Sequence, residues 1–244
     1  TRRSSDLNLL PKKIICYRKT KKGYFLPIGF GPSLRCFIAD RGQELKLLDK
    51  RCQKEIIPVV SKITLHAAQQ EILQKVLLQH RCIVEAKPGF GKTMLGIEVL
   101  SRRGQKTLII VHTRTLLRQW QKRLTDYGVF QANGLGVIGE GKWQLGGQVT
   151  IAMYQTLLSR GTKSLANEFG LLIVDECHHV PAKTFSKIVK SMAAKYCLGL
   201  SATPYRKDKL DKLLTFYLGK IITTSGIDSS LEQTLLPKAD MPTT

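Results

Sequence analysis

The segment at residues 86–93, Ala-Lys-Pro-Gly-Phe-Gly-Lys-Thr, constrains the fold of this chain more than any other part of the sequence. A short apolar run at residues 81–86 leads into it and predicts a buried strand, and the apolar residues that follow recur with a helical period. Gly89 and Gly91 can take backbone angles that other residues rarely adopt, so the N–H groups of the loop can converge on one anion. This order of strand, glycine loop and helix predicts an α/β fold with a phosphate-binding site at the start of a helix.

The loop carries the side chains expected of a nucleoside triphosphate site. Lys92 is expected to reach the β- and γ-phosphates of ATP as a point charge, and the hydroxyl of Thr93 is expected to bind Mg²⁺. The alternative is an ordinary glycine turn with a solvated Lys92, but Gly-Lys-Thr between a strand and a helix rarely serves only as a turn. The loop residues predicted to line the bound nucleotide are Lys87, Pro88, Gly89, Phe90, Gly91, Lys92, Thr93 and Met94.

Two acidic residues, Asp175 and Glu176, follow a second apolar run at residues 171–174. Four consecutive aliphatic residues indicate a strand buried on both faces, as in a parallel sheet covered by helices. Carboxylates at the end of such a strand are costly unless they bind something, although an acidic pair alone is also typical of a solvated turn. Because the glycine loop is also present, we predict that Asp175 shares the Mg²⁺ with Thr93 and that Glu176 orients the attacking water. The predicted catalytic residues are Lys92, Asp175 and Glu176.

Further motifs occur in a recognisable order at residues 65–71, 111–120, 149–157, 175–178 and 201–204. Together with the loop they resemble the first RecA-like lobe of a superfamily 2 helicase of the DEAD/DEAH-box group. The nearest branch contains XPB-like, UvsW-like and type III restriction-subunit (ResIII) translocases, and the similarity covers residues 64–225. Two departures are visible: Lys-Pro-Gly replaces the Pro-Thr-Gly of many relatives at the loop entry, and Cys177 replaces an alanine.

The resemblance implies roles for residues outside the glycine loop. Gln69 is implied to read the adenine edge of ATP. The residues implied to contact nucleic acid are Thr113, Arg114, Tyr154, Gln155 and Thr156. The residues implied to couple hydrolysis to strand movement are His178, Ser201, Ala202 and Thr203. The family completes its ATP site with an arginine from a second RecA-like lobe, which we expect beyond Thr244 because nothing after Pro204 resembles it. We therefore expect this chain alone to turn over little or no ATP.

A helix predicted at residues 114–127 shows how the lobe could meet nucleic acid. Trp120 falls on its inward face, whereas Arg114, Arg118 and Lys122 recur every fourth residue on another face. Such a stripe can meet phosphates at its N-terminal end, and a solvated surface is the alternative, which we favour for Lys122.

Net charge points to a polyanionic partner. The chain has 39 Lys plus Arg against 18 Asp plus Glu, a formal charge of +21, which favours phosphate contacts. Residues 1–63 carry 15 of these basic residues and only 5 of the acidic ones. Basic residues at 18–22 lie beside Tyr24 and predict either a nucleic-acid contact or a solvated lysine-rich hairpin, and the sequence leaves both open. We expect duplex DNA as the partner, with RNA as the alternative.

Composition is that of a folded, water-soluble protein, with 43% hydrophobic and 23% charged residues. No apolar run is long enough to span a bilayer, and the first residues lack the apolar core of a signal peptide, so we expect no membrane partner. The six cysteines show no Cys-x-x-Cys pair and are interpreted as reduced thiols. These features predict an intracellular location, in the cytoplasm, nucleoid or nucleus.

Three units are expected along the chain: a basic α+β accessory segment at residues 1–62, a RecA-like lobe at 63–226 and the start of an interlobe linker at 227–244. In the accessory segment we predict strands at 12–17 and 24–28 and a helix at 33–40, and in the lobe a helix capped by Thr64. The strands predicted for the lobe are residues 81–86, 107–112, 135–138, 149–153, 171–175 and 196–201. Because strands alternate with helices, the sheet should be parallel, and all the motifs fall at strand carboxyl ends, where such sheets bind ligands.

The hypothesis that follows is the ATP-binding lobe of a nucleic-acid-dependent helicase or translocase. Two alternatives remain open from the sequence: a basic nucleic-acid-binding module with a regulatory or dormant nucleotide site, and a restriction-type translocase that moves on duplex without unwinding it.

Overall fold

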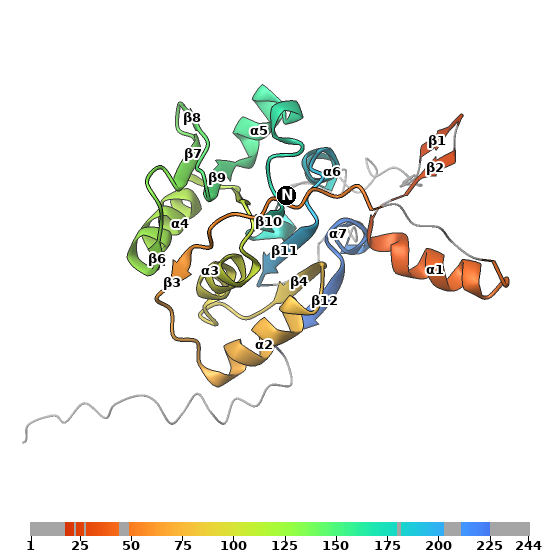
Figure 1. Cartoon of the computed structure of the whole chain (residues 1–244), viewed down its shortest axis with the longest axis horizontal. Helices are drawn as coiled ribbons and strands as arrows, with labels where there is room; N and C mark the ends of the chain where they lie inside the picture. Colours follow the sequence, from red (N-terminus) through yellow and green to blue (C-terminus); the bar gives the residue numbers. More distant parts are fainter. Residues whose placement is uncertain are drawn as a thin grey trace, which may run out of the picture.

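The lobe is built on one eight-stranded sheet with helices on both faces (Figure 1). The computed structural model describes residues 18–21, 23–26, 28–43, 49–179, 182–202 and 211–224. The sheet has the order β12-β4-β11-β10-β5-β9-β7-β8, and every neighbouring pair is parallel except β7 with β8. Its strands are β4 (Arg81–Glu85), β5 (Thr107–Val111), β7 (Leu135–Gly139), β8 (Lys142–Gln144), β9 (Val149–Met153), β10 (Leu171–Val174), β11 (Tyr196–Ser201) and β12 (Lys220–Thr223).

The central strands form where the sequence is continuously aliphatic. All residues of β5 and β10 are buried, as two-sided coverage by helices requires. The six strands predicted for the lobe are all present, and their ends differ from the predicted ends by no more than one residue. The predicted α/β fold with a parallel sheet is therefore confirmed. Strands β8 and β12 were not predicted.

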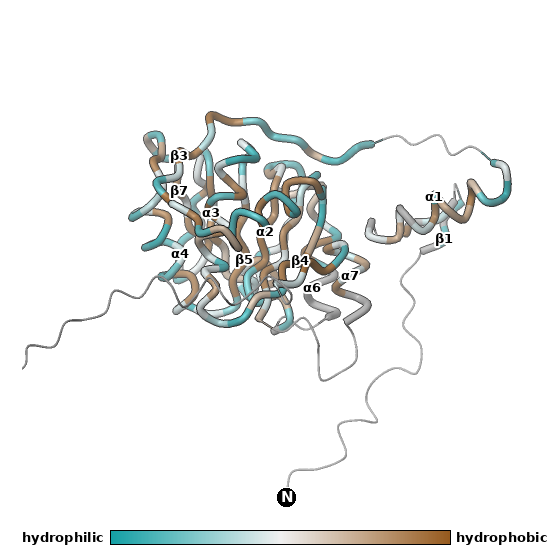
Figure 2. Tube along the Cα trace, turned by 90° about the horizontal axis from the view of Figure 1, so that it is seen from below, coloured by the Kyte–Doolittle hydropathy of each residue, from teal (hydrophilic) through white to brown (hydrophobic). Residues whose placement is uncertain are grey.

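Two apolar clusters cover the sheet, one on each face. Figure 2 shows the central strands as largely hydrophobic, with hydrophilic residues more frequent on the surrounding segments. The first cluster contains buried residues of α2 (Ala67–Leu77), α3 (Lys92–Arg103) and α4 (Arg114–Tyr127). The second contains buried residues of α5 (Tyr154–Arg160), α6 (Ala182–Ser191) and α7 (Asp211–Leu218), together with the short turn η3 (Lys163–Leu165). None of the helices in the described part of the chain is long and apolar enough to cross a bilayer.

Helix α2 begins later than predicted, and Thr64 is not its cap. His66 caps the helix instead: its Nδ1 accepts from the backbone N–H of Gln69 at 3.4 Å. In return Oε1 of Gln69 accepts from the backbone N–H of His66 at 3.2 Å. This reciprocal pair satisfies two N–H groups at the helix end, which Thr64, two residues upstream, does not do.

The accessory segment contains a hairpin and a helix beside α7 (Figure 1). Its elements are β1 (Arg18–Thr20), β2 (Gly23–Phe25), η2 (Ile28–Phe30) and α1 (Gly31–Ala39). The strand predicted at 12–17 lies outside the described residues, and the one predicted at 24–28 ends early because η2 follows it. Gly29 lets the segment approach α7, since a Cβ there would lie 2.4 Å from the carbonyl oxygen of Thr215. The predicted linker at 227–244 also lies outside the described residues.

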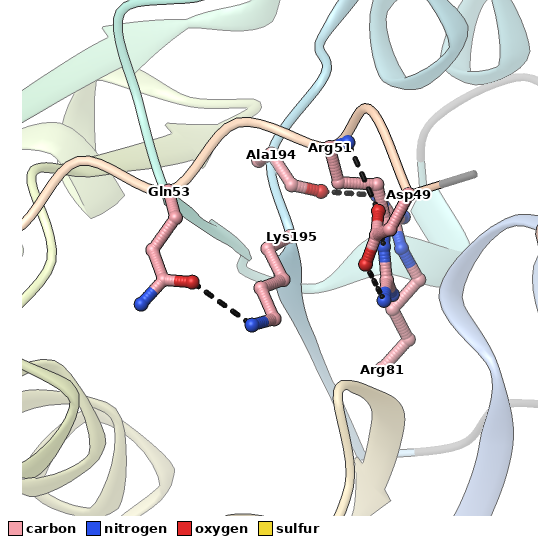
Figure 3. Close-up of polar contacts among 6 residues, drawn as sticks. All are labelled: Asp49, Arg51, Gln53, Arg81, Ala194 and Lys195. Atoms are coloured by element: carbon pink, nitrogen blue, oxygen red, sulfur yellow. Dashed lines mark hydrogen bonds and ion pairs between the residues drawn. The ribbon is translucent and has the colours of Figure 1, made fainter.

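Residues 49–61 form a strap along the amino-terminal end of the sheet, opposite the glycine loop. The strap backbone bonds to the segment before β11 through Cys52 and to the segment before β5 through Lys54. It then forms the short strand β3 (Val60–Ser61), which pairs with β6 (Gly128–Val129). Figure 3 shows the polar contacts at its start: Arg51 to Asp49 at 2.6 Å, Lys195 to Gln53 at 2.9 Å, and Arg81 to the carbonyl of Ala194 at 2.7 Å. Of these contacts, the Lys195–Gln53 bond joins the strap to the lobe, together with the backbone bonds of Cys52 and Lys54, whereas the Arg51–Asp49 pair lies within the strap and the Arg81–Ala194 bond within the lobe. The unit boundary at residue 62 stays a prediction.

Candidate nucleotide site and nucleic-acid face

The predicted glycine loop connects β4 to α3 at the carboxyl end of the sheet. Both glycines adopt left-handed backbone angles, with φ of 87° at Gly89 and 86° at Gly91. A side chain at Gly91 would also collide with Gln69, because a Cβ there would lie 2.4 Å from its Nε2. The left-handed φ favours glycine at position 91, and a Cβ there would in addition displace the side-chain amide of Gln69.

Lys92, the first residue of α3, brings the loop to the acidic strand end. Its side chain is only 11% exposed, and its Nζ donates to the carbonyl of Ala86 at 3.1 Å. The same Nζ lies 3.9 Å from Oε1 of Glu176. Thr93 follows directly in the first turn of the helix. The structure therefore brings together the two halves of the site that the sequence predicted separately.

Asp175 lies directly after β10 and is 4% exposed. Both of its oxygens accept a hydrogen bond: Oδ2 from the indole Nε1 of Trp120 at 2.7 Å, and Oδ1 from the backbone N–H of Glu176 at 3.0 Å. Burial raises the pKa of Asp175, and the Trp120 bond opposes that shift because it stabilises the ionised form. A buried carboxylate held in one orientation is well suited to bind a divalent cation.

A chain of polar contacts runs from Lys92 through Glu176 and His178 to Ser201. Glu176 has a left-handed φ of 46°, and non-glycine residues in this conformation concentrate at functional sites. Its buried Oε2 forms no hydrogen bond with the described residues and lies 3.4 Å from Nδ1 of His178. That Nδ1 is in turn 2.7 Å from Oγ of Ser201, at the end of β11. A buried oxygen without a hydrogen bond, beside a lysine and an aspartate, fits a site that takes Mg²⁺ and a water.

Of the other two predicted coupling residues, the structure describes Ala202 but not Thr203. Ala202 follows β11 and is half-buried. Ala86 donates its backbone N–H to the carbonyl of Ser201 at 3.0 Å, so the start of the glycine loop is tied to this segment.

Gln69 lies against the glycine loop, where its predicted role requires it to be. It is 7% exposed, and its Nε2 donates to the carbonyl of Phe90 at 2.7 Å while its Oε1 belongs to the α2 cap. The Phe90 ring packs edge-on against His66, with ring centroids 5.7 Å apart. Gln69 therefore supports the loop, a function the sequence did not reveal, and its reading of adenine stays a prediction. Lys87, Pro88 and Gly89 are exposed, and Met94 is half-buried.

The five residues implied to contact nucleic acid lie at two adjacent helix starts. Thr113 and Arg114 follow β5, and Tyr154, Gln155 and Thr156 open α5 after the neighbouring strand β9. Gln155 joins the two starts, because its Nε2 donates to the carbonyl of His112 at 2.8 Å. Arg114 is exposed, whereas Thr113 uses its Oγ1 to cap α4 by accepting from the N–H of Leu116 at 3.1 Å. The structure thus gathers these residues at one edge, and their contact with nucleic acid remains a prediction.

The rest of the α4 stripe is engaged with protein carboxylates. Arg118 bonds to Glu140 at 3.0 Å, and Lys122, which is 76% exposed, pairs with Asp126 at 3.0 Å one turn later. This exposure agrees with the solvated surface favoured for Lys122, and the absence of a phosphate contact there stays a prediction. Trp120 is buried at 1% exposure, as predicted.

Residues 62–206, more than half of the chain, match the family model described as type III restriction enzyme, res subunit. The chain belongs to the type III restriction enzyme res subunit family. The resemblance to a superfamily 2 RecA-like lobe, stated from the sequence motifs, is thereby confirmed.

Curated relatives of this res subunit family member are longer than the chain. It is 30% identical over 195 residues to the probable helicase D10 of Escherichia phage T5, covering 80% of this chain and 42% of that protein. It is 34% identical over 170 residues to the DNA 3'-5' translocase XPB2 of Sulfurisphaera tokodaii, covering 70% of this chain and 38% of that protein. The chain therefore spans about four tenths of the length of these relatives.

A solved structure agrees on the fold. The UvsW helicase from bacteriophage T4 superposes with a TM-score of 0.65 at 20% sequence identity, covering 84% of this chain and 80% of that one.

Proposed function

We propose that this chain is the ATP-binding lobe of a motor that couples ATP hydrolysis to movement on, or unwinding of, duplex DNA. The observation that carries the proposal is the polar path from the glycine loop to the end of β11. Lys92, Glu176, His178 and Ser201 lie along it at 3.9, 3.4 and 2.7 Å, with Asp175 next to Glu176. A nucleotide site connected in this way to a second strand end is suited to transmit the state of the phosphates.

Each residue has a defined part in this proposal. The N–H groups of the loop surround the phosphates, and Lys92 offsets their charge. Thr93 and Asp175 would hold Mg²⁺, which when bound supplies positive charge to the β- and γ-phosphate oxygens. Glu176 orients the attacking water and is placed to take its proton. Gln69 would present its amide to the adenine edge once it exchanges a protein partner for the base.

The nucleic-acid partner is proposed from charge and from position. A net charge of +21 favours a polyanion, and exposed Arg114 lies beside Gln155 at the carboxyl edge of the sheet. The relative named a DNA 3'-5' translocase supports DNA over RNA. A motor of this kind works where DNA and ATP occur together, so we propose an intracellular location.

The accessory segment is proposed as an additional phosphate contact. Lys19 and Lys21 are exposed on the β1–β2 hairpin, and Tyr24, at 62% exposure, offers a ring beside them. This arrangement suits a nucleic-acid backbone with aromatic support. A solvated hairpin is the alternative, and it predicts no loss of DNA affinity when both lysines are replaced by glutamate.

Turnover requires a second RecA-like lobe in this proposal. The transition-state charge on the phosphate is matched by an arginine that such a lobe supplies, and an arginine of this kind changes rates by about 10³- to 10⁵-fold. We therefore expect this chain to bind ATP but to hydrolyse it slowly.

Two substitutions test the site. Lys92→Ala should abolish Mg²⁺-ATP binding by this chain in a titration with a fluorescent ATP analogue, whereas the surface variant Lys122→Ala should bind like the parent. Glu176→Gln should keep ATP binding and lose DNA-stimulated hydrolysis in a form that includes the second lobe. Unchanged binding by Lys92→Ala, or undiminished turnover by Glu176→Gln, would contradict the assignment. A form with both lobes that binds ATP but shows no turnover with DNA would instead favour a dormant or regulatory nucleotide site.

Membership of a restriction-subunit family favours a second candidate, translocation along duplex without strand separation. The two activities use the same site and differ in their product. A motor that displaces a triplex-forming strand but does not unwind a forked duplex is a translocase, and one that separates the fork is a helicase.

A further inference from the structure

Trp120 joins the nucleic-acid face to the proposed metal ligand. It lies in the middle of α4, and its indole Nε1 donates to Oδ2 of Asp175 at 2.7 Å. Both residues are buried, at 1% and 4% exposure. A bond of this length between an N–H and a carboxylate, shielded from water, is a strong orienting contact.

The indole is fixed from its other side by α3. A Cβ on Gly96 would lie 2.7 Å from Cη2 of Trp120 and 3.4 Å from a methyl of Leu200, so the ring occupies the space a side chain would need. Glycine is unfavourable in the middle of a helix, and its presence here is explained by this close approach. The indole is therefore packed directly against the backbone of α3 in the orientation that reaches Asp175.

Within the part of the chain that the structure describes, Asp175 has one protein donor on each oxygen. Trp120 occupies one lone pair of Oδ2, and the backbone N–H of Glu176 occupies one of Oδ1. The plane of the carboxylate is set by these two bonds, and each oxygen keeps a lone pair for a further ligand. Of these two bonds, the one from Trp120 comes from another element, so it is the one that changes if α4 shifts.

Helix α4 starts at the proposed nucleic-acid contacts. Arg114 is its first residue, and Trp120 lies six residues later, about 9 Å along a rigid helix. A displacement of the helix start by a bound phosphate backbone is therefore carried to the indole.

We propose that Trp120 is a positioning residue that orients Asp175 toward the metal and couples this orientation to nucleic acid bound at the start of α4. The proposal rests on the proposed function, because it takes Asp175 as a Mg²⁺ ligand and Arg114 as a nucleic-acid contact. Purely structural packing of the ring is the competing explanation, and it makes no use of the indole N–H.

Trp120→Phe tests this, because it keeps an aromatic ring in the cavity and removes the N–H. The matched control is Trp143→Phe, since the chain has two tryptophans and Trp143 is a half-buried residue of β8. We expect Trp120→Phe to bind ATP without Mg²⁺ like the parent but to need about tenfold more Mg²⁺ for half-maximal binding of a fluorescent ATP analogue, as outer-shell changes at metal sites do. Duplex DNA should shift this Mg²⁺ midpoint in the parent and in Trp143→Phe, and not in Trp120→Phe.

A second measurement leaves Trp120 in place. In the Trp143→Phe chain, Trp120 is the remaining tryptophan, so Mg²⁺ added to the ATP-bound chain should change its intrinsic fluorescence. A Trp120→Phe chain with the parent's Mg²⁺ midpoint and DNA response, or an unchanged Trp120 signal, overturns the positioning role. If the parent itself fails to bind Mg²⁺-ATP, the proposed function fails instead, so the two failures are distinguishable.

Discussion

Replacing Gly91 by alanine tests how the glycine loop is held. Gly91 has a φ of 86°, and a Cβ at this position would lie 2.4 Å from Nε2 of Gln69. The substitution therefore has two separable costs. One is backbone strain, and the other is displacement of the Gln69 amide from its partners.

The two costs have similar size. A non-glycine residue in the left-handed region costs about 1–2 kcal/mol. When the Gln69 amide swings away, it loses its bonds to the carbonyl of Phe90 and to the N–H of His66, and leaving such buried groups unpaired costs about 1–3 kcal/mol. Gly91→Ala should therefore lower the free energy of unfolding by about 2–5 kcal/mol.

Gly89→Ala supplies the matched control. Its φ of 87° is the same within a degree, but nothing lies within 4 Å of a Cβ at this position. It should lose only the strain, about 1–2 kcal/mol. The difference between the two variants isolates the contact with Gln69.

Urea denaturation of four chains completes the experiment: parent, Gly91→Ala, Gln69→Ala and the double variant. Because Gln69→Ala removes the obstructing amide, the double variant should be more stable than the sum of the single effects allows. Equal destabilisation by Gly89→Ala and Gly91→Ala, or strict additivity in the double variant, would refute the steric role of Gln69.

Two further predictions concern the surface. Arg114→Ala should weaken binding to duplex DNA uniformly across sequences and reduce the slope of log affinity against log salt by about 1, whereas Lys122→Ala should leave the slope unchanged; equal slopes for both variants would contradict a phosphate contact by Arg114. Asp49→Asn tests the strap: the hydrogen bonds from Arg51 hold the pKa of the Asp49 carboxyl well below its usual range, so its contribution to stability is present above the unfolded pKa and is lost as pH falls through the folded one. Since the Asp49 side chain is 50% exposed, the stability gap between parent and variant should be below about 1 kcal/mol at pH 7, and it should shrink in acid; a gap that does not depend on pH would remove the ion pair as its cause.

Most strands of the lobe could be predicted because the signals for each one lie in a few adjacent residues of the sequence. Residues 171–174 are continuously aliphatic and follow a glycine, a pattern that indicates a strand buried on both faces, and the observed β10 has those bounds. The glycine loop was predictable for a related reason, since strand, glycine and helix signals are adjacent in sequence. The pairing of Lys92 with Glu176 then follows from a general property of parallel sheets, whose carboxyl ends share one edge.

The sequence did not predict the two strands of the sheet in which exposed polar residues alternate with apolar ones or flank them. The edge strand β8, Lys142–Gln144, has two exposed residues and no aliphatic run, and β12, Lys220–Thr223, is short with exposed ends. Neither pattern differs from that of a loop. The cap of α2 was misplaced for another reason: threonine is the commoner capping residue, but the side chain of Gln69 completes a reciprocal pair with His66.

The contact between Trp120 and Asp175 could not be predicted from the hydrophobic periodicity of the sequence. The helical period places Trp120 on the inward face of α4, and the aliphatic run places Asp175 at a strand end, but the axial offset between helix and strand is set by packing. That offset is fixed here by Gly96, whose missing side chain lets α3 and α4 approach until the indole reaches Oδ2 at 2.7 Å. A larger residue at position 96 would separate the two helices and break the bond without altering either partner. The glycine, which the sequence shows only as a weak point in a helix, thus makes room for one of the two contacts that orient the proposed metal ligand.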